Sequence, residues 1–160
     1  MRHTISVIVE NKPGVLSRVS GLFSRRGYNI ESLAVGVTEN PTMSRMTIVV
    51  EGDEEDLEQI IKQLYKLIDT LKVFDLPPTQ AIERELALIK VAATEKTRQE
   101  ITQIVEIFRG KIVDVAENSM IVEITGDANK VSGAEKLLQK FGIKELVRTG
   151  KIALQRGSAE

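Results

Sequence analysis

Apolar and polar residues alternate along the first ten positions, which is the pattern of a strand with one buried face. A strand is predicted over 4–10, and its inward residues would be Ile5, Val7 and Val9. After a break at 11–14 the apolar spacing changes to that of a helix. This helix is predicted to begin near Val15 and to end at Gly27, which can adopt the left-handed conformation of a helix end.

The same kind of patterning continues to residue 76. Strands are predicted over 29–37 and 44–51, joined by a turn, and a further strand over 70–76. Between them a helix opens at Asp53 with an acidic run that suits its N-terminal dipole, and its core stripe is predicted as Leu57, Ile60, Ile61, Leu64 and Ile68. The strand over 29–37 carries one face of small residues, Ser32, Ala34 and Gly36. Strand, helix, strand, strand, helix, strand is the order of a ferredoxin-like unit.

Paired prolines at 77 and 78 mark a linker, assigned to residues 77–83, because they resist both helix and central strand. Beyond it the same order of elements begins again, and the predicted segments are 85–91, 95–109, 111–117, 120–125, 127–141, 143–148 and 151–156. The last two are expected to form an additional hairpin around Thr149-Gly150. The predicted fold class is α+β, with two ferredoxin-like βαββαβ domains in tandem over residues 1–76 and 84–160.

Length and charge limit the function classes. Each half of the 160 residues can bury a modest core. The net charge is −1, from 22 basic and 23 acidic side chains, so no strong field draws the chain to nucleic acid or an anionic membrane. The chain has no cysteine, which excludes disulfides and thiol nucleophiles. No apolar run approaches the ~20 residues that span a bilayer, and no signal or transit pattern opens the chain, so a cytoplasmic protein is expected.

Catalytic residues are not apparent. His3 is the only histidine and lies near a terminus, where a solvated side chain is more common than a general base. Ser17 and Ser20 have no base that spacing pairs with them. The acidic cluster at 53–56 is more typical of a helix cap than of a metal site, because four adjacent carboxylates cannot all face one ion. No phosphate-binding loop or dinucleotide fingerprint is present, so neither catalysis nor a metal site is predicted.

The turn Asn11-Lys12-Pro13-Gly14 is the candidate binding element. Pro13 suits the first helical position, and Gly14 lets a ligand approach the backbone closely. Free amides and the positive end of the dipole at a helix start attract a carboxylate or phosphate. Asn11 is placed to cap the helix or to hydrogen-bond a ligand. The spacing alone is equally typical of an ordinary strand-to-helix turn.

The longer pattern around this turn carries more information. VENKPGVLSRVSGLFSRRGYNIESLAV resembles the opening of an ACT domain. With PTMSRMTIVVEGDEEDLEQIIKQLYKLIDTLKV, ERELALIKV and EIFRGKIVDV, the chain is identified as a member of the regulatory (small) subunits of acetolactate synthase, also called acetohydroxyacid synthase. The resemblance covers nearly the whole chain.

The resemblance implies a regulatory subunit that is not itself an enzyme. Two ACT domains would pair as a dimer and bind a branched-chain amino acid, with valine expected, between them. The Gly14, Val15 and Leu16 amides would receive its carboxylate. Asn11 and Asn29 would bind its polar groups, and Ile30 with Val15 would line an apolar pocket, Asn29 and Ile30 coming from the other chain. Lys12 departs from the family's usual small or acidic residue, and could pair with the carboxylate or be solvated.

The same resemblance implies a partner, the catalytic large subunit, which this chain would activate and through which valine would exert feedback inhibition. Thiamine diphosphate, FAD and magnesium would belong to that subunit, and this chain would carry no cofactor. The Asn-Lys-Pro-Gly turn has no counterpart at 93–96, so no equivalent ligand site is expected in the second half.

Three alternative functions compete with this interpretation. An ACT-type regulator of a different enzyme would share the turn. An RNA-binding ferredoxin-like module would stack bases on aromatic side chains of central strands, but the segments 4–10 and 44–51 contain none. A small enzyme on this fold, such as an acyl-phosphate hydrolase, would want an arginine in the first turn, which offers only Lys12.

Overall fold

The computed structural model describes residues 1–157, which form two compact units. The first unit holds residues 1–82 together with the C-terminal segment that begins at Gly150, and the second holds residues 83–149. The predicted second domain, 84–160, differs from this division in the segment after Thr149. Residues 158–160 of that predicted domain lie outside the described residues.

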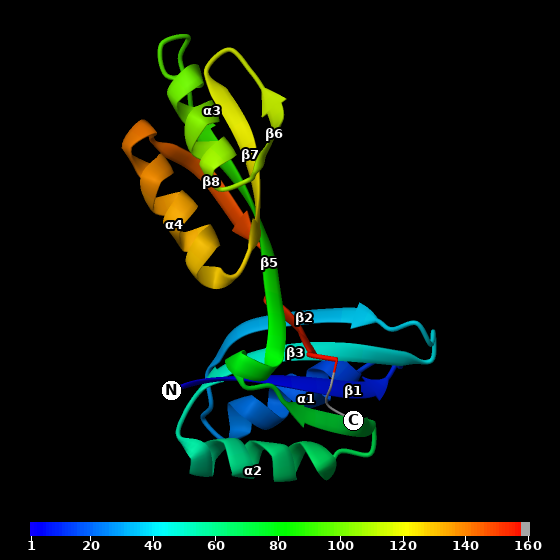
Figure 1. Ribbon diagram of the computed structural model, residues 1–160. Coiled ribbons are helices and arrows are strands. Elements are labelled where there is room, and N and C mark those ends of the chain that lie inside the picture. Colours follow the sequence, from blue (N-terminus) through cyan, green and yellow to red (C-terminus); the bar gives the residue numbers. More distant parts are fainter. Residues whose placement is uncertain (158–160) are drawn as a thin grey trace. The chain divides into compact units, whose positions relative to one another are not determined.

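The first unit is a four-stranded antiparallel sheet with two helices on one face (Figure 1). Its strands lie in the order β2-β3-β1-β4. The central pair runs in continuous register from Arg2 opposite Glu51 to Glu10 opposite Met43. The elements are β1 (Arg2–Glu10), α1 (Val15–Arg25), β2 (Ile30–Val37), β3 (Met43–Glu51), α2 (Glu54–Tyr65) and β4 (Thr70–Asp75). The predicted ferredoxin-like order is confirmed.

Alternate residues of the central strands fill the core between this sheet and its helices. They are Ile5, Val7, Val9, Met46, Ile48 and Val50 from the strands and Val15, Val19, Leu22, Phe23, Leu57, Ile60 and Leu64 from the helices. The predicted place of Ile68 in the core stripe of α2 is wrong, because Ile68 is 91% exposed. The reason is that α2 ends at Tyr65, so the helical period that would have turned Ile68 inward no longer applies.

The second unit repeats the same architecture. Its sheet has the order β6-β7-β5-β8, and α3 and α4 cover one face (Figure 1). The expected linker is partly ordered, because η1 forms a short 3₁₀ turn and β5 begins directly after it. The elements are η1 (Pro78–Gln80), β5 (Ala81–Ala92), α3 (Arg98–Ile107), β6 (Lys111–Val115), β7 (Ser119–Gly126), α4 (Ala128–Leu138), η2 (Gln139–Phe141) and β8 (Ile143–Arg148).

The final strand, β9 (Ile152–Gln155), pairs with β5 and not with β8. The predicted hairpin around Thr149-Gly150 is therefore wrong. Thr149 stays with β5 of the second unit, since its amide donates to the Leu86 carbonyl at 2.9 Å and its Oγ1 accepts from the Leu86 amide at 2.9 Å. From Gly150 onward the chain belongs to the first unit and does not turn back on β8. Residues 150–156 are called the C-terminal strap below.

Candidate functional site

The start of α1 is open. Gly14 is its N-cap residue with a left-handed backbone, φ +85°, and no side chain caps the helix. Pro13 therefore precedes the cap, and its predicted place at the first helical position is wrong. The first amides of any α-helix lack acceptors within the helix, and the first turn of α1 contains no acidic residue. This combination leaves a positive helix end accessible to an anion.

The other helix starts make the contrast clear. Asp53 caps α2 by accepting from the Asp56 amide, and the Asp56 side chain returns the bond to Asp53. Asp127 caps α4 by accepting from the Lys130 amide at 2.8 Å. Carboxylates thus already occupy the starts of α2 and α4. α3, like α1, has no side-chain cap, but it carries Glu100 in its first turn, so among these helices only α1 starts with neither a cap nor an acidic residue.

Asn11 is held by the β2–β3 hairpin. Its amide donates to the Thr42 carbonyl at 2.8 Å, and its side-chain Nδ2 donates to the Pro41 carbonyl at 3.0 Å. It does not cap α1, because Gly14 occupies that position. Asn11 is exposed. Because its Nδ2 donates to the hairpin, this hydrogen bond also fixes the orientation of its side-chain oxygen.

Arg18 is a residue of this site that the sequence analysis missed. Its Nε donates to Asp69 Oδ2 at 2.7 Å, and Asp69 is only 5% exposed. A Cβ built on Gly14 would lie 2.9 Å from Arg18 Nη1, so the guanidinium lies directly beside the turn. The signal available in the sequence is the spacing of four residues between Gly14 and Arg18, which places both on one side of a helix.

Lys12 is engaged within its own turn. Its Nζ lies 2.8 Å from Glu10 Oε2 in an exposed ion pair. The hydrogen bond to the Glu10 carboxylate, together with its charge, raises the pKa of Lys12 above its ordinary value. The protonated side chain is thus paired with Glu10 and remains 63% exposed to solvent.

Val15 and Leu16 differ in what they can offer a ligand. Val15 is 3% exposed and its side chain packs in the first core, and its amide donates to the Lys12 carbonyl at 3.4 Å, a long hydrogen bond within the turn. In one copy of the chain its side chain therefore contacts the core and not the surface at the turn. Leu16 is 45% exposed, which leaves its side chain accessible at the same turn.

Asn29 and Ile30 lie at the opposite end of the sheet from the turn in the same chain. Ile30 is level with Val50 and His3, whereas Asn11 follows Glu10 at the far end of β1. At about 3.3 Å per residue, the two levels are roughly 25 Å apart. Asn29 is exposed and Ile30 is half-buried against the core. One copy of the chain therefore does not bring the two predicted halves of the site together.

Comparison with known proteins decides the family. The AHAS small subunit-like ACT domain matches residues 5–72, and the family described as small subunit of acetolactate synthase matches residues 84–157. A probable acetolactate synthase small subunit of Archaeoglobus fulgidus is 58% identical over 99% of both chains, and one of Methanothermobacter thermautotrophicus is 55% identical over 98% of this chain and 94% of its own. The crystal structure of the Thermotoga maritima small subunit superposes with a TM-score of 0.93 at 46% identity, covering 99% of both chains.

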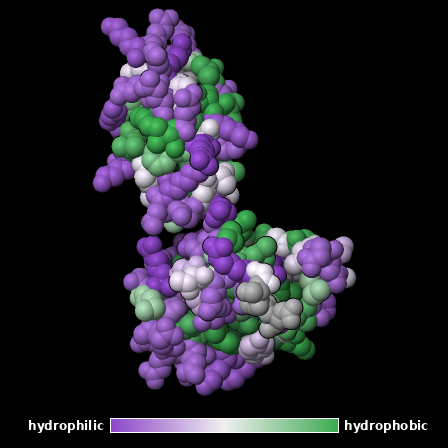
Figure 2. All heavy atoms as spheres, in the orientation of Figure 1, coloured by the Kyte–Doolittle hydropathy of each residue, from purple (hydrophilic) through white to green (hydrophobic). Residues whose placement is uncertain are grey.

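The chain belongs to the acetolactate synthase small-subunit family. The resemblance drawn from the sequence is thereby confirmed, as is the predicted class of a non-catalytic regulatory subunit with an ACT domain. Within residues 1–157, no group of three or more histidine and acidic side chains is arranged to hold a metal ion. None of the described helices is long and apolar enough to cross a membrane. The visible face of the molecule is largely hydrophilic with scattered apolar groups (Figure 2).

The second unit of this family member has its own version of the strand-to-helix turn. In the first unit the Glu10 amide donates to Asp69 and the Asn11 amide to Thr42; in the second, the Ala92 amide donates to Gly142 and the Ala93 amide to Asn118. The two turns are therefore structurally equivalent. A cavity of about 400 Å³ lies at the second turn, lined among others by Thr94, Thr97, Asn118, Lys140, Phe141 and Lys144. The sequence did not predict this cavity.

Proposed function

We propose that this chain is the regulatory subunit of an acetolactate synthase: it activates a catalytic large subunit and binds a branched-chain amino acid, valine first, between two copies of its first unit. The observation that carries the proposal is the open start of α1 at Gly14, without a side-chain cap or an acidic residue in the first turn. Family membership supplies the enzyme that is regulated.

The carboxylate of the amino acid would bind at this helix start. Amides of Gly14 and Leu16 would provide donors, together with the Val15 amide if the carboxylate replaces its 3.4 Å bond to the Lys12 carbonyl, and the helix dipole favours the negative charge. Arg18 adds a positive group beside Gly14 that Asp69 holds in place. A charge-assisted hydrogen bond to a carboxylate is stronger than a neutral one, so these donors together would anchor the ligand.

A second copy of the chain would complete the site. Since Asn29 and Ile30 lie roughly 25 Å from the turn in one chain, a two-fold arrangement that reverses the strand direction can bring these residues to the turn of the other copy. The Asn29 oxygen would accept from the ligand ammonium. Ile30 and the exposed Leu16 would form the apolar wall for the side chain, in place of the buried Val15.

The edge of the first sheet supports such a dimer. β2 is an edge strand, and its partner within the sheet is β3. Val35 and Val37 on this strand are 47% and 60% exposed. An unpaired edge with exposed valines is a ready template for pairing with the same strand of a second copy. Ligand held between two copies would alter the geometry or stability of the dimer, which is how occupancy could reach the large subunit.

Isothermal titration of the purified chain with valine, leucine, isoleucine and serine tests the proposal. Valine should give saturable heat, leucine and isoleucine weaker binding, and serine none. One methylene in an apolar pocket is worth about 1–3 kcal/mol, so the branched-chain ligands should differ in affinity without any being fully rejected. Absence of heat with all three branched-chain amino acids would contradict the effector site.

Matched glycine variants assign the site to the helix start. Gly14→Asp places a side chain and a negative charge where the carboxylate would bind, and should abolish valine binding. Gly27→Asp is the control, because Gly27 ends the same helix with φ +73° and a Cβ built on it would meet no atom within 4 Å. Both variants carry a similar left-handed strain, of about 1–2 kcal/mol. Equal loss of valine binding in both, with folding confirmed by circular dichroism, would remove the assignment to α1.

Asn29→Ala tests the second half of the site. It should weaken valine binding by about 1–3 kcal/mol if the ammonium loses its acceptor, and sedimentation should show whether the dimer persists. Pull-down and reconstitution with the large subunit then test activation directly. A chain that binds valine but neither binds nor activates the large subunit would favour an ACT regulator of another enzyme.

A further inference from the structure

The first two residues of the C-terminal strap, Gly150 and Lys151, contact β2, the strand that begins with the proposed effector residue Ile30. Gly150 lies so close to β2 that no side chain fits: a Cβ built on it would lie 2.4 Å from the Leu33 carbonyl oxygen and 3.0 Å from the Ala34 nitrogen. Both neighbours are backbone atoms, which cannot turn aside as a side chain can. Glycine is required here by the close approach of two backbones.

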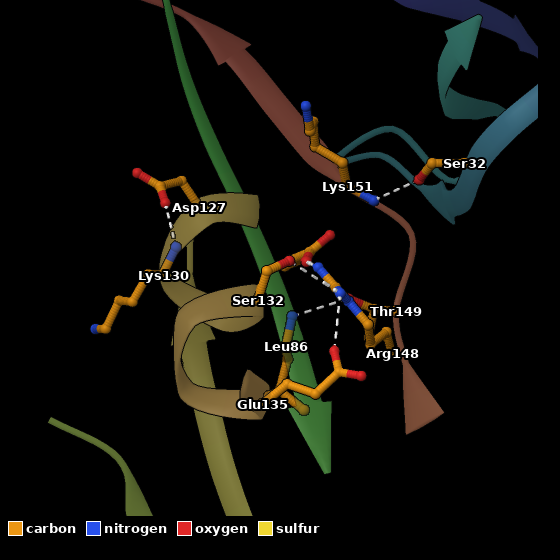
Figure 3. A network of polar contacts seen from close by, with 10 residues as sticks. Ser32, Leu86, Asp127, Lys130, Ser132, Glu135, Arg148, Thr149 and Lys151 are labelled. Carbon is orange, nitrogen blue, oxygen red and sulfur yellow. Dashed lines mark hydrogen bonds and ion pairs between the residues drawn. The ribbon is translucent and has the colours of Figure 1, made fainter. Parts of the chain in front are cut away.

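The residue that follows extends the contact. The Lys151 amide donates to Ser32 Oγ at 2.9 Å, a bond drawn between the strap and β2 in Figure 3. Ser32, Ala34 and Gly36 are the small face of β2 noted in the sequence. Leu33 between them packs inward against the first core, so the strap lies on the sheet face that the helices do not cover. Small side chains on that face are what allow the close approach.

The strap is held at its far end as well. Ala153 is 5% exposed and packs with Leu76 and Ala81 in a small apolar cluster that Phe74 borders. The Arg156 amide donates to the Gln80 carbonyl at 2.8 Å. The contacts at Ser32 and Leu33 are therefore made by a segment that is anchored on both sides.

The start of β2 depends on outside support. β2 has β3 as its partner, and their register shifts between Ile30 and Ser32, so the ladder is interrupted beside Ile30. A bulge of this kind re-aims nearby side chains. Glu31 within it pairs with Arg2 at 2.8 Å, but the Arg2 side chain is 72% exposed, and exposed ion pairs contribute little. The strap contacts β2 directly after this irregularity.

We infer that the C-terminal strap holds the start of β2 in its effector-binding position, with Gly150 and Ser32 as positioning residues, so that the strap and the bound amino acid stabilise each other. This inference rests on the proposed function and deepens it. If the seated strap favours the conformation of Ile30 that binds the amino acid, then by linkage the amino acid favours the seated strap to the same extent.

The strap is also a covalent route between the two units. Thr149 is bonded to Leu86 of the second unit, and the next residue, Gly150, lies against Leu33 of the first. A change at β2 on effector binding therefore acts on a segment that continues without a spacer into β8.

Hydrogen exchange of the ligand-free chain tests the positional part of the inference. In Gly150→Ala, the amides of β2 should exchange faster than in the wild type, because the clash unseats the strap. Gly157→Ala is the matched control, since a Cβ at Gly157 meets no atom within 4 Å, and it should leave β2 exchange unchanged. Unchanged β2 exchange in Gly150→Ala would overturn the inference whether or not valine binds.

Titration with valine tests the coupling. Gly150→Ala should weaken valine affinity about tenfold, the equivalent of 1.4 kcal/mol. Ser32→Ala removes only the hydrogen bond from Lys151 and should cost about two- to tenfold; it also serves if Gly150→Ala does not fold. Valine should in turn slow exchange of the strap amides in the wild type.

Faster β2 exchange with wild-type valine affinity in both variants would overturn the coupling. No valine binding by the wild type would instead refute the proposed function, while β2 exchange still decides whether the strap holds β2.

Discussion

The two units share one strand-to-helix turn, but the residues at the start of the following helix differ. In both units, two backbone amides at the end of the first strand donate hydrogen bonds. One goes to the residue just before the last strand, and the other goes to the turn of the hairpin that follows the first helix. In the first unit the following helix starts at Gly14 without a cap. In the second, α3 also starts without a side-chain cap, but Glu100 lies in its first turn, where α1 has no acidic residue. The fold positions a helix start in each unit, and the local side chains decide whether it is open to an anion.

Charge placement separates the units at a second pair of equivalent positions. Asp75 lies opposite Ile5 as Arg148 lies opposite Ala87. In the second unit Arg148 forms an ion pair with Glu85 and contacts Ser132 and Glu135 (Figure 3). At Asp75, by contrast, burial raises the pKa of the carboxyl. The second unit thus engages the charged side chain at this position in ion pairs, whereas the first unit places an exposed carboxyl there whose ionised form is disfavoured by a partial loss of hydration.

The largest expected effect on stability comes from truncating a buried leucine in the core of either unit. Leu64→Ala and Leu138→Ala each remove a side chain that is 0% exposed, one in each unit, and each should lower the free energy of unfolding by about 2–5 kcal/mol. Chemical denaturation measures both. Leu138→Ala should leave valine affinity within about twofold, because Leu138 packs in the core of the second unit and not in that of the first. A large loss of valine affinity in Leu138→Ala would mean that the second core supports the effector site.

Two buried carboxylates sharpen the comparison. Asp69 pairs with Arg18 in the first unit and Glu85 with Arg148 in the second. Asp69→Asn should cost about 1–3 kcal/mol of unfolding free energy, because it removes the charged partner of Arg18. Glu85→Gln should cost less, because Arg148 keeps Glu135 at 3.6 Å. Titration should distinguish them: Asp69→Asn should also weaken valine binding, since Arg18 lies beside Gly14. Identical effects on valine affinity would contradict a role for Arg18.

Exchanging the helix starts gives a smaller effect on stability. Gly14→Asn supplies a side-chain cap and tolerates the left-handed backbone better than other residues. The unfolding free energy should change by no more than about 1 kcal/mol, while valine affinity falls because the new side chain occupies the amides. Thr97→Asn is the matched change at α3 and should leave valine affinity unaltered. Retained affinity in Gly14→Asn would show that the carboxylate binds elsewhere.

The smallest effect concerns pH. The raised pKa of Asp75 comes first from burial, which Glu54 reinforces and His3 opposes. The folded state therefore holds this proton more tightly than the unfolded state, so the contribution of Asp75 to stability is present below its ordinary pKa of 3.8 and is lost as pH rises through the raised value. Asp75→Asn should gain stability relative to the wild type as pH rises through this range in thermal denaturation. A pH-independent difference would contradict this assignment.

The sequence predicted the fold and the family because both depend on local patterns. Alternation placed the strands, helical spacing placed α1 and α2, and the turn at 11–14 with the RGYNIESL segment identified the family. Predictions that extended a pattern beyond its element were wrong. Ile68 continued the stripe of α2 after the helix had ended, and Pro13 was assigned to a helix that begins two residues later.

The structure alone decided features that depend on residues far apart in the chain. Arg18 reaches Asp69 across 51 positions, and Lys151 reaches Ser32 across 119. No periodicity encodes such contacts, because they arise only when separate elements pack. The same holds for the partner of β9, since a strand's alternation states which face is buried but not which strand lies beside it. The sequence alone determined the elements and the chemistry of the turn, whereas tertiary packing placed Arg18 at the turn and the strap on β2.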